Sequence, residues 1–221
     1  MLYPPHQPLT TVSQATYLGV ELASNLSWTP HINKITTKAS QSLGFLKRNF
    51  HSAKPETKTA AYKSIVRPTL EYSSPVWDPY QTCDIQKLEK VQIRAARFVT
   101  NNYSKDPGTV THTLNNLKWD SLQKRRQLSR LSLFYKIHHG LVDIRPSQYL
   151  DPLTRQSRHS HHLSYQIPYC PSDYIKYSFF PRTAVEWNSL PVHVVSADTA
   201  TAFKSVLFTF YHHNCHNFLG G

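Results

Sequence analysis

Apolar residues that recur with the period of an α-helix constrain the fold of this chain most strongly. After Pro30 they fall three or four positions apart, at Ile32, Ile35, Ala39, Leu43 and Leu46. This spacing predicts one apolar face on an amphipathic helix. We expect Thr29 as the N-cap and Pro30 as the first helical residue, because proline at that position costs no helical hydrogen bond. The helix is predicted to end near Phe50.

The same period predicts four further helices. One begins at Pro55, and Pro68 is expected to stop or kink it, since proline lacks an amide hydrogen and clashes with the preceding turn. The other three are predicted at residues 84–101, 120–140 and 199–214. At the start of the second of these, Asp120 as N-cap and Gln123 three residues later resemble a capping box.

The N-terminal region has a different pattern. Residues 1–15 contain three prolines and are expected to form an irregular arm. The segment 17–22, with the sequence YLGVEL, is rich in residues that favour strands and is followed by turn-forming residues at 23–25. It predicts a strand or half of a β-hairpin.

Proline and aromatic residues also interrupt the helical pattern elsewhere. Residues 72–80 are predicted to form a packed loop. Beyond residue 146 the periodicity is weak, and we expect short strands or loops at 163–167 and a short helix at 183–188. The predicted fold is therefore mainly α, with a helical bundle, a short N-terminal β-hairpin and an irregular α+β C-terminal segment.

Basic residues outnumber acidic residues in this 221-residue chain. Lys and Arg number 25 and Asp and Glu 13, which gives a formal charge of +12. Such a surplus favours binding to phosphate polyanions or to an anionic membrane surface. The mean hydropathy is −0.47, and no apolar run approaches the roughly 18–20 residues that a membrane-spanning helix needs.

The cysteines and the N-terminus indicate the compartment. Cys83, Cys170 and Cys215 are an odd number without CxxC spacing, which argues against a disulfide scaffold. The first residues lack the basic flank and apolar run of a signal peptide. We therefore expect a protein of the cytoplasm or nucleus that is not secreted.

The positive charge is organised on the predicted helices. On the helix at 84–101, a stripe spaced three, four and three residues apart consists of Lys87, Lys90, Arg94 and Arg97. Like charges at this spacing repel each other by a few tenths of a kcal/mol per pair. Such a stripe either binds a polyanion, which offsets the repulsion, or is a well-solvated face.

Two smaller basic clusters lie on other predicted helices. Lys34 and Lys38 form a pair on the first helix. Lys124, Arg125 and Arg126 form a cluster on the helix at 120–140. For this cluster a solvated helix face, a nuclear import signal and an RNA contact all remain open.

No local motif for catalysis is present. The acidic residues are dispersed and no two lie within three positions of each other, although carboxylates distant in sequence can assemble in space. The sequence lacks a Walker loop, a GxSxG motif and an HExxH motif. We expect no enzymatic activity from this chain alone.

Two histidine-rich segments were weighed as zinc sites. His212 and His216 are four residues apart with Cys215 between them, so they can share a helical face. No second cluster supplies the remaining ligands, and a frayed polar C-terminus is favoured. The group at 159–162, with His159, His161 and His162, is interpreted most simply as an exposed loop. No metal site is predicted.

Several longer segments resemble, in the same order, the C-terminal part of reverse transcriptases encoded by jockey-like non-LTR retrotransposons. They are YLGVEL, LSWTPHINKITTKASQSLGFLKRN, AYKSIVRPTLEYSSPVWDPY, IQKLEKVQIRAARFVTNNY, LNNLKWDSLQKRRQLSRLSLFYKI and SFFPRTAVEWNSLP. The resemblance covers residues 17–208, nearly the whole chain. It implies a fragment of an RNA-directed DNA polymerase.

The resemblance also implies a division of the chain. Residues 1–27 would form an arm and a hairpin like the primer grip at the edge of the palm, with Tyr17, Leu18 and Gly19 on the grip. Residues 28–145 would form the helical thumb, which holds the template and primer and would carry Lys34, Lys38, Lys87, Lys90, Arg94 and Arg97. Residues 146–221 would form the C-terminal segment. Leu18 as a core residue and Gly19 as a residue for close packing remain alternatives.

The same resemblance bounds the expected function. In that family the catalytic aspartates lie in the palm, which has no counterpart in this sequence, so Mg²⁺ would belong to the missing palm and no cofactor to this chain. The expected partners are RNA, an RNA/DNA hybrid or DNA, together with the palm and fingers of the full polymerase. Two alternatives remain open: a domesticated protein-interaction module, and a decayed copy without a selected function.

Overall fold

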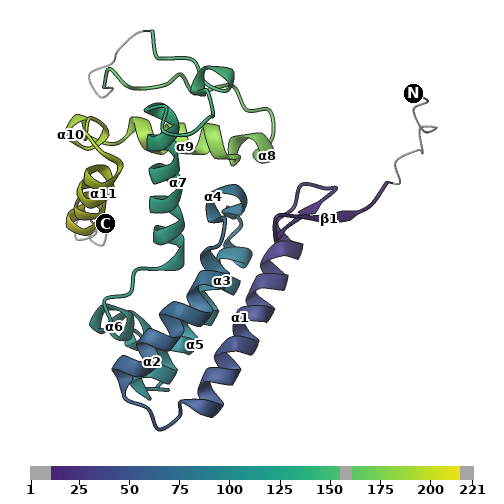
Figure 1. The fold of residues 1–221 in the computed structure, drawn as a ribbon, viewed down its shortest axis with the longest axis vertical. Coiled ribbons are helices and arrows are strands. Elements are labelled where there is room, and N and C mark those ends of the chain that lie inside the picture. The colour runs from purple at the N-terminus through teal and green to yellow at the C-terminus, as the bar shows by residue number, and fades with distance from the viewer. Residues whose placement is uncertain (1–10, 155–160, 215–221) are drawn as a thin grey trace, which may run out of the picture.

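The computed structural model describes residues 11–154 and 161–214 (Figure 1). Helices make up most of this part of the chain, and one two-stranded hairpin precedes them. This arrangement confirms the predicted mainly α fold with an N-terminal hairpin. None of the described helices is both long enough and apolar enough to cross a lipid bilayer.

The hairpin pairs β1 (Gln14–Tyr17) with β2 (Val20–Ala23) in antiparallel register, with Tyr17 opposite Val20. The chain reverses at Leu18 and Gly19, whose φ angles are +46° and +81°. Two-residue hairpin turns require this left-handed backbone, which glycine adopts without steric cost. The prediction of one strand over 17–22 is therefore corrected, because that segment contains the turn and parts of both strands.

Two long helices form the framework of the first half. α1 (Thr29–Asn49) packs against α5 (Thr82–Thr100), and both bury the apolar face that their periodicity predicts. Thr29 is not the N-cap of α1 as expected. Its hydroxyl donates a 2.7 Å hydrogen bond to Asp84 Oδ2 of α5, while Trp28 occupies the cap position without a side-chain bond.

A helical segment interrupted by a π-turn follows α1. It consists of α2 (Pro55–Ala61), the π-helix η1 (Tyr62–Val66) and α3 (Arg67–Glu71), as the element bounds show. Pro68 lies in the first turn of α3. Because a π-turn is wider than an α-turn, it accommodates a residue that cannot donate the regular hydrogen bond. The chain therefore stays helical on both sides of Pro68, with an altered turn between.

Short helices and α7 complete this half. α4 (Ser74–Trp77) lies where a loop was expected, and α6 (Thr109–Asn116) was not predicted. The N-cap of α7 (Leu122–His138) is Ser121, whose Oγ accepts a 3.1 Å hydrogen bond from the Lys124 amide. The predicted cap at Asp120 is therefore corrected by one residue.

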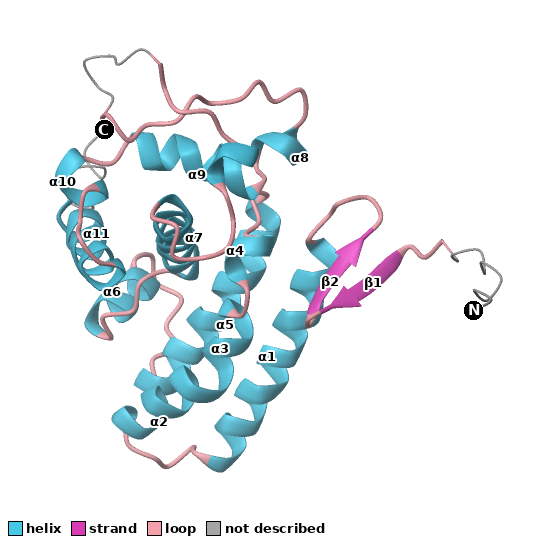
Figure 2. Cartoon of the chain, turned by 45° about the horizontal axis from the view of Figure 1, so that its top comes forward, coloured by secondary structure: helices cyan, strands magenta, loops and turns pink. Residues whose placement is uncertain are grey.

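The described C-terminal part wraps around α7 with several short helices and one longer helix, as Figure 2 shows in a view close to the α7 axis. In chain order they are η2 (Pro146–Gln148), α8 (Asp173–Lys176), α9 (Phe179–Asn188), α10 (Val192–Val195) and α11 (Ala200–Asn214). The last confirms the helix predicted at 199–214. Of the short strands or loops expected at 163–167, the structure shows a loop with one isolated bridge between Tyr165 and Pro152.

The buried apolar side chains of the described residues form two clusters. The first runs from Val20 to Leu122 and joins β2, α1, α3, η1 and α5. The second runs from Leu131 to Leu207 and surrounds Trp187 with residues of α7, α9, α10 and α11. α7 is common to both, because its N-terminal Leu122 lies in the first cluster and its later residues lie in the second.

A partly buried histidine beside the second cluster, His138, makes stability depend on pH. Burial, and secondarily the charges of His139 and His161, lowers the pKa of His138 to about 4. Between this value and the ordinary pKa of about 6.5, the unfolded chain binds more protons than the folded chain. The stability contributed by neutral His138 is therefore complete above pH 6.5 and is lost as the pH falls toward 4.

We predict that His138→Gln removes part of this acid sensitivity. Urea unfolding at pH 7 and pH 4.5 should show that wild type loses about 1 kcal/mol more than the variant, a figure reduced for the partial exposure of the ring. Equal losses in the two proteins would contradict the assignment of this titration to His138.

Candidate nucleic-acid interface

A basic groove lies between α1 and α5. The predicted stripe of Lys87, Lys90, Arg94 and Arg97 lines one side of it, so the structure brings all four residues together. Arg48 joins them from α1. The neutral polar lining residues are Thr36, Thr37, Ser40 and Gln41. No carboxylate is among the described residues that line the groove, which measures about 840 Å³.

Local contacts hold the cations of this basic groove in place. Arg94 Nη2 donates a 2.8 Å hydrogen bond to Ser40 Oγ across the groove. Lys87 Nζ lies 2.8 Å from Asp84 Oδ1, so part of its charge is neutralised. Lys47 lies nearby, and its pKa is lowered by burial and by the charge of Arg94. Like charges are therefore concentrated along the groove.

Lys34 and Lys38 lie on α1 outside the lining of the basic groove. Lys34 Nζ is 3.0 Å from Glu21 Oε2 of β2 and so ties α1 to the hairpin. Lys38 is exposed. The sequence pattern places both on the helix but cannot distinguish them from the groove residues.

The cluster predicted on α7 is used within the fold. Lys124 Nζ lies 3.0 Å from Asp120 Oδ1, and Arg125 makes a two-point contact with the carboxylate of Glu71. Arg126 has a fully buried side chain, and its Nε donates a 2.7 Å hydrogen bond to Asp78 Oδ1. A buried guanidinium bound in this way cannot reach a phosphate, so we leave Arg126 out of the candidate interface.

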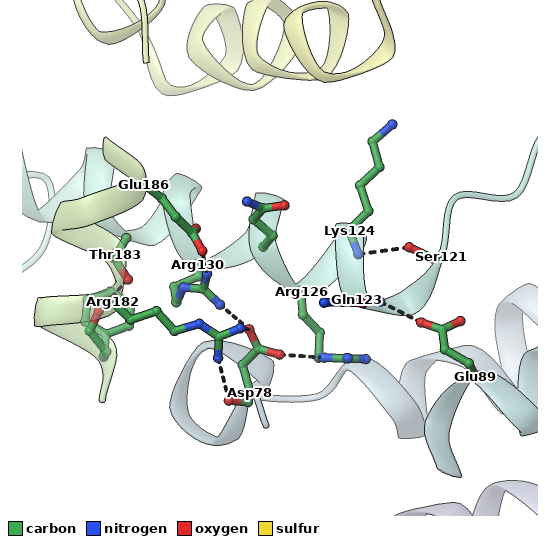
Figure 3. A network of polar contacts seen from close by, with 12 residues as sticks. Asp78, Glu89, Ser121, Gln123, Lys124, Arg126, Arg130, Arg182, Thr183 and Glu186 are labelled. Atoms are coloured by element: carbon green, nitrogen blue, oxygen red, sulfur yellow. Dashed lines mark hydrogen bonds and ion pairs between the residues drawn. The ribbon is translucent and has the colours of Figure 1, made fainter. Parts of the chain in front are cut away.

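Asp78 is the centre of a buried charge network that the sequence did not reveal (Figure 3). Its carboxylate accepts hydrogen bonds from Arg126 and Arg130 of α7 and lies 3.4 Å from Arg182 Nη2 of α9. Arg130 also pairs with Glu186 of α9. The network thus joins the α4 segment, α7 and α9. Residues 48 to 104 positions apart form it, so no local motif could have predicted it.

The predicted primer-grip residues occupy the tip of the hairpin. Tyr17 and Leu18 are 68% and 73% exposed, so Leu18 is not a core residue. Tyr72 of the segment after α3 donates a 3.1 Å hydrogen bond to the Leu18 carbonyl oxygen. The Cβ of an alanine at Gly19 would lie 3.4 Å from the Tyr72 ring, which is an ordinary van der Waals contact, so the positive φ rather than close packing favours glycine here.

The histidine segments do not form a metal centre in the part of the chain that the structure describes. No group of three or more His, Cys, Asp and Glu side chains there is arranged to hold a metal ion. His212 Nε2 lies 3.3 Å from Asp120 Oδ1, while Cys215 and His216 are outside the described residues. His159 is also outside them. His161 is buried with Nε2 3.1 Å from the Trp187 carbonyl oxygen, which corrects its expected exposure, and His162 is exposed.

Comparison with known proteins gives one informative similarity. The chain is 29% identical over 133 residues to a Drosophila melanogaster protein described as a probable RNA-directed DNA polymerase from transposon BS. The match covers 59% of this chain and 15% of that protein's length. No protein-family model matches the chain, and no solved structure matches it significantly. The similarity supports a relationship with part of a transposon-encoded reverse transcriptase.

We predict that Asp78→Asn strongly destabilises the fold. Removing one partner from a buried ion network leaves uncompensated charge, at a cost of about 3–5 kcal/mol in the free energy of unfolding. Urea denaturation measures this loss. Asp143→Asn is the matched control, because Asp143 is exposed and its replacement should cost less than about 0.5 kcal/mol. Equal stabilities of the two variants would contradict the central role of Asp78.

Proposed function

We propose that this chain binds template and primer nucleic acid as the thumb-like part of a jockey-like retrotransposon reverse transcriptase. The observation that carries the proposal is the basic groove between α1 and α5, where five cations meet without a lining carboxylate. The similarity to a transposon RNA-directed DNA polymerase supports the same conclusion from the sequence. The ligand would be RNA, an RNA/DNA hybrid or DNA.

The dimensions and chemistry of the basic groove suit a phosphate backbone. From Lys87 to Arg97 the stripe extends over ten residues of helix, or about 15 Å. The hydroxyls of Thr36, Thr37 and Ser40 add neutral groups that commonly contact phosphate oxygens. Phosphate contacts position a nucleic acid without reading its sequence. We therefore propose binding that is strong at low salt and independent of sequence.

The hairpin tip is the second element of the proposed interface. Tyr17 and Leu18 project from the turn as exposed apolar side chains next to α1. The ion pair between Lys34 and Glu21 connects the hairpin to α1, and the hydroxyl of Tyr72 donates a hydrogen bond to the Leu18 carbonyl oxygen in the hairpin turn. An exposed aromatic residue on a supported turn can stack on a nucleotide. This tip would contact the primer, in keeping with the resemblance to a primer grip.

We further propose that the chain alone does not polymerise. Metal-dependent nucleotidyl transfer requires clustered carboxylates. In the described residues the buried aspartates make structural contacts: Asp78 pairs with arginines, and Asp84 pairs with Lys87 and accepts a hydrogen bond from Thr29. The palm, with its metal ions, would come from the rest of the polymerase. Such a protein would act in the nucleus or cytoplasm.

We predict that Lys90→Glu combined with Arg94→Glu abolishes most nucleic-acid binding. Both side chains are exposed in the basic groove, so their reversal should leave the fold intact. For wild type and an RNA/DNA hybrid, fluorescence anisotropy should give a log–log salt slope of about −4, from roughly five phosphate contacts. The variant should bind at least tenfold more weakly, with a slope reduced by about 2.

Lys63→Glu combined with Lys204→Glu is the matched control. Both lysines are exposed and lie outside the basic groove, and the formal charge falls by the same four units from +12. This variant should retain near wild-type affinity. Equal weakening of both variants, or wild-type binding that is indifferent to salt, would contradict the proposed groove and favour the alternative of a protein-interaction module.

A further inference from the structure

A second cavity, separate from the basic groove, lies where the hairpin, α4 and the α8–α9 region meet. It holds about 350 Å³. Its aromatic wall consists of Trp28, Tyr80, Tyr174, Tyr177 and Phe179. Ligand cavities typically measure about 300–1,000 Å³ and combine apolar walls with a few polar groups. This cavity is at the lower end of that range, so it suits one small ligand.

The aromatic wall is already arranged for stacking. The rings of Tyr80 and Tyr177 are parallel within 7°, with centroids 4.2 Å apart. Their segments are almost a hundred residues apart, so the folded chain positions this pair. Trp28 lies in the same wall and is the one tryptophan among the four that is not buried. A planar ligand can continue this stack without rearrangement of the chain.

The floor of this cavity carries an excess of positive charge. Arg130, Arg182 and Asp78 line it, and ion pairs among the described residues join three arginines to the two carboxylates of Asp78 and Glu186. Both oxygens of Asp78 already accept hydrogen bonds from α7. Arg182 lies 3.4 Å from the Asp78 carboxylate and donates a 3.0 Å hydrogen bond to the Asp78 carbonyl oxygen. It is the most exposed of the three arginines, so it is the one that a ligand in the cavity can contact.

The start of α9 reinforces this charge. Ser178, its N-cap residue, lines the cavity together with Phe179, and no side chain caps the helix there. The first backbone amides of a helix and its dipole favour an anion. Arg182 and the N-terminus of α9 therefore both contribute positive charge to the lining of the cavity.

We propose that this cavity binds a single nucleotide, with its base against Trp28 and the Tyr80–Tyr177 pair and its phosphate at Arg182. An aromatic body with one anionic group matches the stacked wall and the surplus cation. The choice of a nucleotide among such ligands rests on the proposed function. The cavity volume limits the site to one base, which distinguishes it from the basic groove.

The two sites are connected through one carboxylate. Asp84 accepts hydrogen bonds from Thr29, next to Trp28 of the cavity wall, and from Lys87 of the basic groove. Along α1, Trp28 and Thr36 of the groove are eight residues apart, or about 12 Å. The basic groove and the cavity therefore lie close to each other along α1.

The test uses uridine 5′-monophosphate and quenching of Trp28 fluorescence. We expect saturable quenching by the nucleotide and at least tenfold weaker binding of uridine, which lacks the phosphate. The Trp28→Phe variant should lose the signal while calorimetry still detects binding. Equal affinities for uridine and its monophosphate, or quenching that persists in Trp28→Phe, would overturn the proposal.

Variants separate this site from the basic groove. Val76→Glu places a carboxylate on the wall at a position that is 57% exposed, and should weaken nucleotide binding at least tenfold. Val185→Glu, at a valine 54% exposed outside the cavity, should bind as wild type does, and so should the Lys90→Glu, Arg94→Glu variant. Wild-type nucleotide affinity in Val76→Glu would overturn the proposal.

Failure of the two proposals can be distinguished. If the hybrid binds in a salt-dependent manner but the mononucleotide does not bind, the cavity inference fails and the groove proposal stands. If the mononucleotide binds but the hybrid does not, the groove proposal fails and the cavity is a site for free nucleotides.

Discussion

The pairing of Asp78 with arginines of α7 and α9 is the interaction on which the described structure depends most. Two apolar clusters share α7, because Leu122 at its start lies in the first cluster and its residues from Leu131 onward lie in the second. Asp78 follows α4, and its carboxylate binds Arg126 and Arg130 from one helix and lies near Arg182 from another. Buried charges demand close partners, because an unpaired ion in the interior costs several kcal/mol. The ion pairs of Asp78 therefore fix the positions of α7 and α9 relative to the first half of the chain.

Part of the surplus positive charge of this +12 chain is paired with carboxylates within the fold. On α7, Arg125 forms an ion pair with Glu71 and Arg126 forms one with Asp78. Lys124 of the same helix is paired with Asp120. On α5, among the residues that the structure describes, the basic stripe has one carboxylate contact, between Lys87 and Asp84, and the remaining positive charge faces the basic groove. Two clusters that look alike in sequence therefore have different roles. The burial of the side chains and their carboxylate partners distinguish the cluster on α7 from the stripe on α5. The proposed interface is therefore assigned to α5.

Helical periodicity was sufficient to predict α1, α5, α7 and α11 and four of the five basic residues that line the groove, those on α5. It missed α6 and α4 because each is short, and packing rather than a long apolar repeat stabilises such elements. The hairpin turn was missed because Leu18 adopts a backbone conformation that is rare for a branched residue. The Asp78 network and the aromatic cavity assemble from distant segments, so single-sequence reasoning had no local signal for either.

Cross-linking of a bound RNA/DNA hybrid to the protein tests the central claim, that the α1–α5 groove holds nucleic acid, most directly. The hybrid would carry photoreactive groups on its backbone, and mass spectrometry would locate the modified peptides. We expect the cross-links to concentrate on residues 36–48 of α1 and 87–97 of α5, and unlabelled hybrid to compete with them at low salt. Cross-links confined to α7 and α11, with the α1 and α5 peptides unmodified, would contradict it.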